Sequence, residues 1–509
     1  MRNRYLYITL LAVLGWNVET QGQTGNRQVP RLVVNITIDQ LRSDYLEAFT
    51  PLYGNDGFKR LTEQGVVFAG TYPFDHPDRA SAISTILTGT TPFYHGIVGL
   101  QWMDRSSLRP VRCTEQMLKP GVATPDNLTV STLGDELKVS TNGEAKIFAI
   151  APYQDMAVLS AGHAADNACW MDERTGQWTT SQYYANNTPN WLLSFNELRR
   201  LNNISRKYVW KPLDAPQGRA AFEHVMKGEN GYRQYLRSAL INSDITELAL
   251  QSVANLTLGS DSITDLLCLT YYAGLYEDKP VTDCQSELKD TYLRLDRELG
   301  KLINDLEQKL GKEHVLFVVT STGEAETDAT DYAKYRIPTG TFYINRAANL
   351  LNMYFGAQWG QARYIETSYD NQIFVNHKLL EQKRLDKTDF YARSQAFLTE
   401  MAGVKSVYTS IQLQNAHNDH LLRMRNSFSP QRCGDILIEV APGWRLQHED
   451  TGSNRLSQVS AVPFPVIFYG GDLQAEHVKG TITTDRIAPT LAKAIRIRAP
   501  NACSSEPLF

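Results

Sequence analysis

Apolar positions along this chain fall into short runs, and most of these runs are followed by a segment with helical spacing. Six runs predict strands: Leu32–Ile38, Lys146–Ile150, Asp265–Tyr271, Val315–Thr320, Asp435–Val440 and Pro465–Tyr469. Strands that alternate with helices are typical of α/β proteins. We therefore predict a mostly parallel central sheet that is sandwiched by helices.

The clearest helical pattern runs from about Gln285 to Leu310. Its large apolar residues recur at spacings of three and four: Leu288, Tyr292, Leu295, Leu299, Leu302, Leu306 and Leu310. That spacing places them on one face of a helix, so we expect this face to pack on the core.

Two segments depart from the alternation. Residues 170–255 are rich in Tyr, Trp, Asn and Arg, and we predict an inserted cap there. Residues 339–413 show the order strand, helix, two strands, helix, strand, which predicts a small α+β subdomain. The cap tryptophans Trp178, Trp191 and Trp210 could stack on a sugar or peptide, or could pack the cap itself.

The first residues have the pattern of an export signal. Arg2 and Arg4 precede an apolar run from Tyr5 to Trp16. A run of about 12 residues is too short to cross a bilayer core of about 30 Å as a helix. We predict a signal peptide over residues 1–22, a main domain over 28–509, no transmembrane segment, and a periplasmic or secreted protein.

Export would allow disulfide bonds. The chain has six cysteines, which could form up to three bridges: Cys113, Cys169, Cys268, Cys284, Cys433 and Cys503. The composition is otherwise that of an ordinary globular protein, with 42% hydrophobic and 21% charged residues. A net charge of −4 gives no basic field for nucleic acid, so we expect no nucleic-acid partner.

Several motifs together resemble a known family. The first predicted strand ends in Asp39, within Ile-Thr-Ile-Asp-Gln-Leu-Arg, and Thr-Gly-Thr-Thr-Pro-Phe-Tyr-His-Gly-Ile-Val-Gly follows at 88–99. Further motifs are Thr-Leu-Gly-Asp-Glu-Leu at 132–137, Ala-Gly-His at 161–163 and Asp-Thr-Tyr-Leu-Arg-Leu-Asp at 290–296. The chain resembles the alkaline phosphatase superfamily, in its branch of type I phosphodiesterase/nucleotide pyrophosphatases and bacterial periplasmic phosphomonoesterases.

The resemblance implies a reaction at two zinc ions. In such a site the ions lie about 4 Å apart and clamp the attacking and leaving oxygens. Carboxylates and imidazoles bind the zinc, and a Thr or Ser at a helix start is the nucleophile.

Most of the implied ligand positions hold other residue types. Counting back from Asp290 puts Leu275 and Lys279 where the family's Asp-x-x-Gly-His pattern has its Asp and His. Thr322 and Gly323 stand at the next Asp-His pair, and Asn454 is nearest to the last His. Asp39 alone remains of six expected ligands.

The other catalytic positions are altered as well. The nucleophile position falls on Arg79, with Ser81 as the nearest hydroxyl if the register slips. The family's transition-state Lys-x-Arg pair falls on Tyr153 and Asp155. We therefore predict no catalytic residues and no cofactor, and a pseudoenzyme that serves as an exported binding or scaffold protein.

An alternative is an active phosphomonoesterase or phosphodiesterase with a rebuilt or displaced zinc site. Asp75, His76 and Asp78 could join Asp39 as ligands. The simpler interpretation is a polar loop in which Asp78 caps the following helix, while Asp39 accepts hydrogen bonds.

Two basic residues, Arg79 and Lys279, bear on which kind of ligand the protein could bind. Arg79 at a helix start, with Lys279 nearby, could bind an anion such as phosphate. Alternatively, the two cations pair with Asp39 and with Glu277 or Asp278. The partner is thus predicted as an unknown protein or as a small anionic or glycan ligand.

Overall fold

The computed structural model describes residues 28–116, 119–202, 207–214, 220–323, 325–327, 332–450, 452, 454–456 and 458–509. The predicted signal peptide lies outside the described residues. Within them, no helix combines the length and apolarity needed to cross a membrane.

A nine-stranded mixed sheet forms the centre of the main lobe, in the order β24-β2-β23-β13-β1-β12-β7-β8-β9. In that order the strands are Glu476–Thr483, Val66–Thr71, Phe464–Gly470, Val315–Ser321, Leu32–Asp39, Asp265–Tyr272, Ile147–Ala151, Asn167–Met171 and Trp178–Thr180. The five strands from β13 to β8 run parallel to one another. Strands β1, β12 and β13 are buried along their whole length, as expected for parallel strands covered on both faces. The predicted α/β fold is confirmed.

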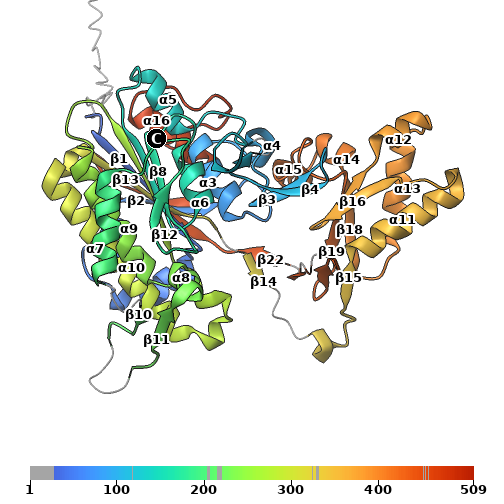
Figure 1. The fold of residues 1–509 in the computed structure, drawn as a ribbon, viewed down its shortest axis with the longest axis horizontal. Helices are drawn as coiled ribbons and strands as arrows, with labels where there is room; N and C mark the ends of the chain where they lie inside the picture. The colour runs from blue at the N-terminus through green and yellow to red at the C-terminus, as the bar shows by residue number, and fades with distance from the viewer. Residues whose placement is uncertain are drawn as a thin grey trace, which may run out of the picture.

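Helices cover both faces of this sheet (Figure 1). On one side lie α7 (Asn190–Asn202), α9 (Leu240–Asn255) and α10 (Gln285–Leu310), and on the other α3 (Arg79–Thr88) and α6 (Gln154–Ala161). The predicted long helix is confirmed in α10, and six of its seven expected face residues are buried.

A second lobe stands apart from the main one (Figure 1). Its antiparallel sheet has the order β16-β17-β19-β18, with bounds Ile365–Tyr369, Gln372–Val375, Ile436–Val440 and Val404–Thr409. Helices α11 (Ile344–Trp359) and α13 (Lys387–Thr399) pack on this sheet around a hydrophobic core of their own.

One strand was assigned to the wrong sheet. We expected the run Asp435–Val440 in the central sheet, but β19 pairs with β17 and β18 in the second lobe. An apolar run indicates that a strand is buried, but it does not indicate which strand it pairs with. The second lobe also includes a three-stranded sheet of β15 (Thr341–Tyr343), β20 (Arg445–Gln447) and β21 (Asn454–Leu456), so its elements extend beyond residue 413.

The segment from 170 to 255 contributes a hairpin, β10 (Lys207–Trp210) with β11 (His224–Lys227), and helix α8 (Gly228–Leu236). Trp178 and Trp210 are buried, and Trp191 packs on Phe148 with ring centroids 5.7 Å apart. Two of the three cap tryptophans are therefore core side chains and not exposed stacking surfaces.

The expected disulfide bonds are not present in the structure. All six cysteines fall within the described residues, and each is a free thiol. Five of them are buried, and Cys503 is partly exposed.

Candidate functional site

The first group of predicted site residues lies where β1 and β13 end. Asp39 is the last residue of β1 and is 5% exposed. Thr322 directly follows β13, which pairs in parallel with β1, so the two residues meet at one edge of the sheet. The Thr322 hydroxyl donates to Asp39 Oδ1 at 2.8 Å, and the Gln40 amide donates to Thr322 Oγ1 at 3.0 Å.

Arg79 supplies the cation of this group, and it is already paired. It is the first residue of α3, and its Nε and Nη2 donate to the two Asp155 carboxylate oxygens at 2.7 and 3.0 Å. Its guanidinium also lies 4.0 Å from the centroid of the Tyr153 ring. A bidentate pair of this kind fixes both side chains and neutralises both charges.

We call Asp39, Thr322, Arg79, Asp155 and Tyr153 the Asp39 cluster. Burial raises the pKa of Asp39 to about 6, although the nearby Arg79 charge and the Thr322 hydrogen bond lower it. Burial disfavours the charged form of a carboxylate, and here it outweighs both stabilising contacts.

Gly323 follows Thr322 of the cluster, at a position where a larger side chain would fit poorly. Its φ is +76°, in the left-handed region that favours glycine. A Cβ at this position would lie 3.0 Å from Tyr72 Cε2, which is tighter than ordinary packing. Position 323, where the resemblance would place a histidine, therefore accommodates glycine better than a larger side chain.

Leu275 and Lys279 lie beyond the end of β12. Leu275 is partly buried against the main core, and its carbonyl accepts from the Tyr272 hydroxyl at 2.8 Å. Lys279 is about half exposed, forms an ion pair with Glu277 at 2.9 Å and lies over the Tyr276 ring. Lys279 therefore pairs locally and does not contact Asp39.

The partner of Arg79 was missed by sequence reasoning. We expected Arg79 and Lys279 to pair with Asp39 and with Glu277 or Asp278. The Lys279–Glu277 pair is present, whereas Arg79 pairs with Asp155 and Asp278 pairs with Arg237. The signal available in the sequence was their opposite charge, because both Arg79 and Asp155 had been singled out as positions of the same site.

The loop before α3 holds the remaining predicted ligands. Asp78 caps α3 by accepting from the Ser81 amide at 2.9 Å, and its other oxygen accepts from the Leu100 amide at 2.6 Å. Ser81 is 2% exposed, and its hydroxyl donates to Asp78 at 2.9 Å. Asp75 accepts from Arg423 Nε at 2.8 Å. His76, which lies between Asp75 and Asp78 in the sequence, has a backbone φ of +54°.

These donors do not fit a zinc ion. Zinc sites use at least three carboxylate, imidazole or thiolate ligands. Among the residues that the structure describes, no three His, Cys, Asp or Glu side chains are grouped to hold a metal. The groups that act on Asp39 are the Thr322 hydroxyl, the Arg79 guanidinium and the more weakly acting carboxylates of Asp155 and Asp278, and Asp155 and Asp278 are themselves paired with arginines.

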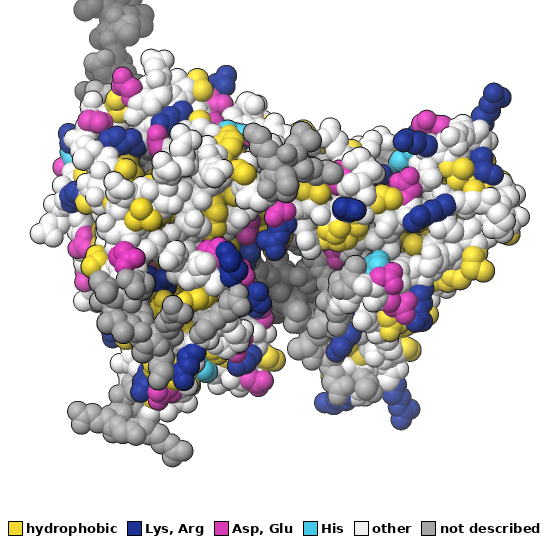
Figure 2. Space-filling model, viewed as in Figure 1, with side chains coloured by type: hydrophobic (Ala, Val, Ile, Leu, Met, Phe, Trp, Pro, Cys, Tyr) yellow, Lys and Arg dark blue, Asp and Glu magenta, His cyan; other side chains and the backbone are white. Residues whose placement is uncertain are grey.

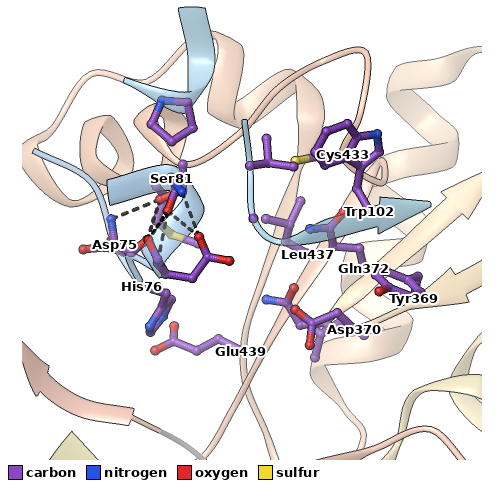
Figure 3. A pocket seen from close by; sticks show the side chains of 18 of the residues that line it. Asp75, His76, Ser81, Trp102, Tyr369, Asp370, Gln372, Cys433, Leu437 and Glu439 are labelled. Atoms are coloured by element: carbon purple, nitrogen blue, oxygen red, sulfur yellow. Dashed lines mark hydrogen bonds between the residues drawn. The ribbon is translucent and has the colours of Figure 1, made fainter. Parts of the chain in front are cut away.

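A cleft of about 760 Å³ opens beside the Asp39 cluster, between the two lobes (Figure 3). Residues Asp75, His76, Asp78 and Ser81 line its main-lobe side. The backbone of Asn454 pairs with that of Gln447, which lines the cleft. On the face drawn in Figure 2, basic and acidic side chains are interspersed and the surface is hollowed between the lobes.

Comparison with known proteins gives the family. The sequence profile described as "Type I phosphodiesterase / nucleotide pyrophosphatase" matches residues 33–461, which is most of the chain. The chain belongs to the type I phosphodiesterase/nucleotide pyrophosphatase family. The predicted resemblance is confirmed.

Relatives within the alkaline phosphatase superfamily match this family member over nearly their whole lengths. Alkaline phosphatase PafA of Elizabethkingia meningoseptica is 26% identical, over 94% of each chain. Alkaline phosphatase PhoV of Synechococcus elongatus is 26% identical, over 93% of this chain and 91% of its own. A protein of Myroides odoratus named calcium-transporting ATPase is 28% identical, over 94% of each chain.

The fold of this family member matches a solved structure. The crystal structure of wild-type PafA superimposes with a TM-score of 0.77 at 23% identity, covering 94% of this chain and 98% of that one. Alkaline phosphatases typically use metal ions, whereas the groups closest to Asp39 in this family member include the Thr322 hydroxyl and the Arg79 guanidinium.

Proposed function

We propose that this phosphoesterase-family protein is exported and binds a ligand or partner without hydrolysing phosphate esters. The observation that carries the proposal is the Asp39 cluster, in which the polar groups satisfy one another. Thr322 donates to Asp39, and Arg79 pairs with Asp155 through two hydrogen bonds. A zinc pair needs free carboxylates and imidazoles, and these residues offer neither in sufficient number.

A second candidate is an active phosphomonoesterase or phosphodiesterase. It is favoured by the full-length similarity to the alkaline phosphatases PafA and PhoV. Its metal would be zinc, its ligands would come from Asp39, Asp75, His76 and Asp78, and Ser81 would be the nucleophile. Against it, Asp75 and Asp78 already accept hydrogen bonds from Arg423 and from backbone amides.

Metal content and turnover distinguish the two candidates. The purified protein is incubated with excess zinc, desalted and analysed by inductively coupled plasma mass spectrometry. The same sample is assayed with p-nitrophenyl phosphate and bis(p-nitrophenyl) phosphate, with PafA as the positive control. We expect less than stoichiometric zinc and no turnover above the blank. Two tightly bound zinc ions per chain with turnover that is lost in Ser81→Ala would establish the second candidate instead.

Export is tested separately. Intact-mass analysis of the protein from periplasmic and culture fractions should show a chain shortened by the predicted signal peptide. A full-length chain confined to the cytosolic fraction would contradict export without bearing on hydrolysis.

A further inference from the structure

The cleft between the lobes combines segments that are far apart in the sequence. Figure 3 shows Asp75 and His76 on one side of it and Trp102 and Tyr369 on the other. Trp102 belongs to β3 (Gln101–Asp104) of the main lobe, whereas Tyr369 ends β16 of the second lobe. Its volume of about 760 Å³ falls within the range of about 300–1,000 Å³ typical of small-molecule sites. A cleft of this size suits a small ligand rather than a folded protein.

Arginine bridges fix the width of the cleft. Arg423 of α15 (Asp419–Asn426) binds Asp75 and also donates to the Tyr72 and Phe74 carbonyls at 2.9 and 3.1 Å. Arg105 of the main lobe donates to Asp435 at 3.1 Å and to the Cys433 carbonyl at 2.6 Å. Because these contacts hold the lobes together, a ligand would enter a preformed site and lose little free energy in ordering it.

The charged groups of the lining are already engaged. Lys405 is the one lysine or arginine among the described lining residues, and it pairs with Glu439 at 2.6 Å. Asp75 pairs with Arg423, Asp78 accepts from two backbone amides, and the fourth lining carboxylate, Asp370, also has a partner. A phosphate ester would therefore meet no unpaired lysine or arginine, and a polyamine would compete with existing partners for each of the four lining carboxylates. The lining favours a neutral ligand.

What the lining offers besides these pairs is amide and aromatic groups. Gln101, Asn371 and Gln447 carry side-chain amides, which both donate and accept hydrogen bonds. Tyr369 and Tyr408 add aromatic rings, whose hydroxyl groups already bond Gln101 in the first case and His420 and Glu439 in the second. Sugar hydroxyls also donate and accept, and the apolar C–H face of a sugar ring packs on an aromatic face. The lining thus matches both surfaces of a carbohydrate.

We propose that the cleft between Asp75–His76 and Tyr369–Asn371 binds a neutral oligosaccharide. This inference rests on the proposed function, because it names the ligand class of a protein that binds and does not hydrolyse. Tyr369 would stack on one sugar ring, and Asn371 would exchange hydrogen bonds with its hydroxyl groups.

Calorimetric titration of the full mature chain tests the proposal. The probes are chitotetraose, maltotetraose and laminaritetraose, with spermidine and inorganic phosphate as the cationic and anionic alternatives. A neutral peptide, tetraglycine, represents the remaining class. We expect one of the tetrasaccharides to bind at one site per chain with a Kd below about 1 mM. Binding of none of them, or binding of phosphate, spermidine or tetraglycine in their place, would overturn the proposal.

Cleft variants locate the binding. Tyr369→Ala should weaken binding of that tetrasaccharide about tenfold, and Asn371→Ala about three- to tenfold, because each removes one kind of contact. Tyr335→Ala is the matched control, since Tyr335 is 62% exposed and outside the lining. Circular dichroism melting checks that each variant folds, and Asn371→Ala carries the test if Tyr369→Ala is unstable. Binding unaffected by both cleft variants would place the sugar elsewhere and refute the assignment.

The two proposals fail separately. Zinc-dependent hydrolysis would overturn the proposed function, whether or not sugar binds. Lack of tetrasaccharide binding in a protein that neither binds zinc nor hydrolyses esters would refute the oligosaccharide assignment alone.

Discussion

The Asp39 cluster and the interlobe cleft are adjacent, yet their polar groups are used in opposite ways. In the cluster, a buried carboxylate, a hydroxyl and a bidentate ion pair bind one another. In the cleft, the charged groups and tyrosine hydroxyls also have partners, but tyrosine rings and the amides of Asn371 and Gln447 line a volume of about 760 Å³. Polar groups that satisfy one another stabilise a fold, whereas polar groups that face a cavity can recognise a ligand. Substitutions should therefore change stability in the cluster and binding in the cleft.

The largest effect is expected from Asp155→Ala. This change leaves the Arg79 guanidinium without its bidentate partner, and removing one member of a buried pair costs several kcal/mol. Because the Arg79 side chain is 25% exposed, we expect a loss of about 3–4 kcal/mol in the free energy of unfolding. Urea denaturation measures it. The control is Asp278→Ala, which breaks the exposed pair with Arg237 and should cost less than about 1 kcal/mol. Equal losses in the two variants would mean that the cluster is no more important for stability than the surface.

Asp39→Asn should stabilise the protein at neutral pH. The folded-state pKa of Asp39 is about 6, above its ordinary value of 3.8, so the folded state holds this proton more tightly than the unfolded state. Stability from this group is present at low pH and is lost as pH rises from about 4 to about 6. At pH 8 the variant should be more stable by about 2–3 kcal/mol, and at pH 4 the difference should vanish. Thermal melts across this pH range would refute the assignment if both proteins showed parallel profiles.

Leu275→Asp should destabilise the protein and should not restore hydrolysis. A single added carboxylate does not complete a zinc site, and it replaces an apolar side chain packed on the main core. We expect a loss of about 1–2 kcal/mol in urea denaturation, with Leu275→Met as the size-matched control. Zinc-dependent turnover in this variant would show that the other ligands are already present, which supports the active-enzyme candidate.

The smallest effect is expected in the cleft. Lys405→Ala breaks the pair with Glu439, whose side chains are 51% and 32% exposed, and should change stability by less than about 1 kcal/mol. Its effect should appear instead in ligand selection, because Glu439 then becomes available to a cation such as spermidine. A large loss of stability in this variant would remove the distinction between the two regions.

Much of the fold could be predicted from the sequence, because long buried strands and a regular helical stripe are local patterns. The strands β1, β12 and β13 and the helix α10 were predicted within one or two residues. The small α+β subdomain was predicted, but the place of β19 in its sheet was not, since strand pairing depends on tertiary contacts that an apolar run does not encode.

The candidate site could be predicted from the sequence only in part. Counting from motifs predicted one site for Asp39, Thr322 and Arg79, which do lie near one another, but it did not give the partner of Arg79 or that of Lys279. Those depend on rotamers and neighbouring charges. The cleft lining was foreseen only in Asp75, His76, Asp78 and Ser81, because Trp102 and Tyr369 come from distant segments.

The conformation of Gly323 restricts which residues can stand at this position. A histidine there would meet the Tyr72 ring and would have to adopt a backbone angle that L-amino acids disfavour. Any engineered ligand at position 323 would therefore need compensating changes in the loop and at Tyr72, and a single substitution there should lower stability rather than add a working ligand.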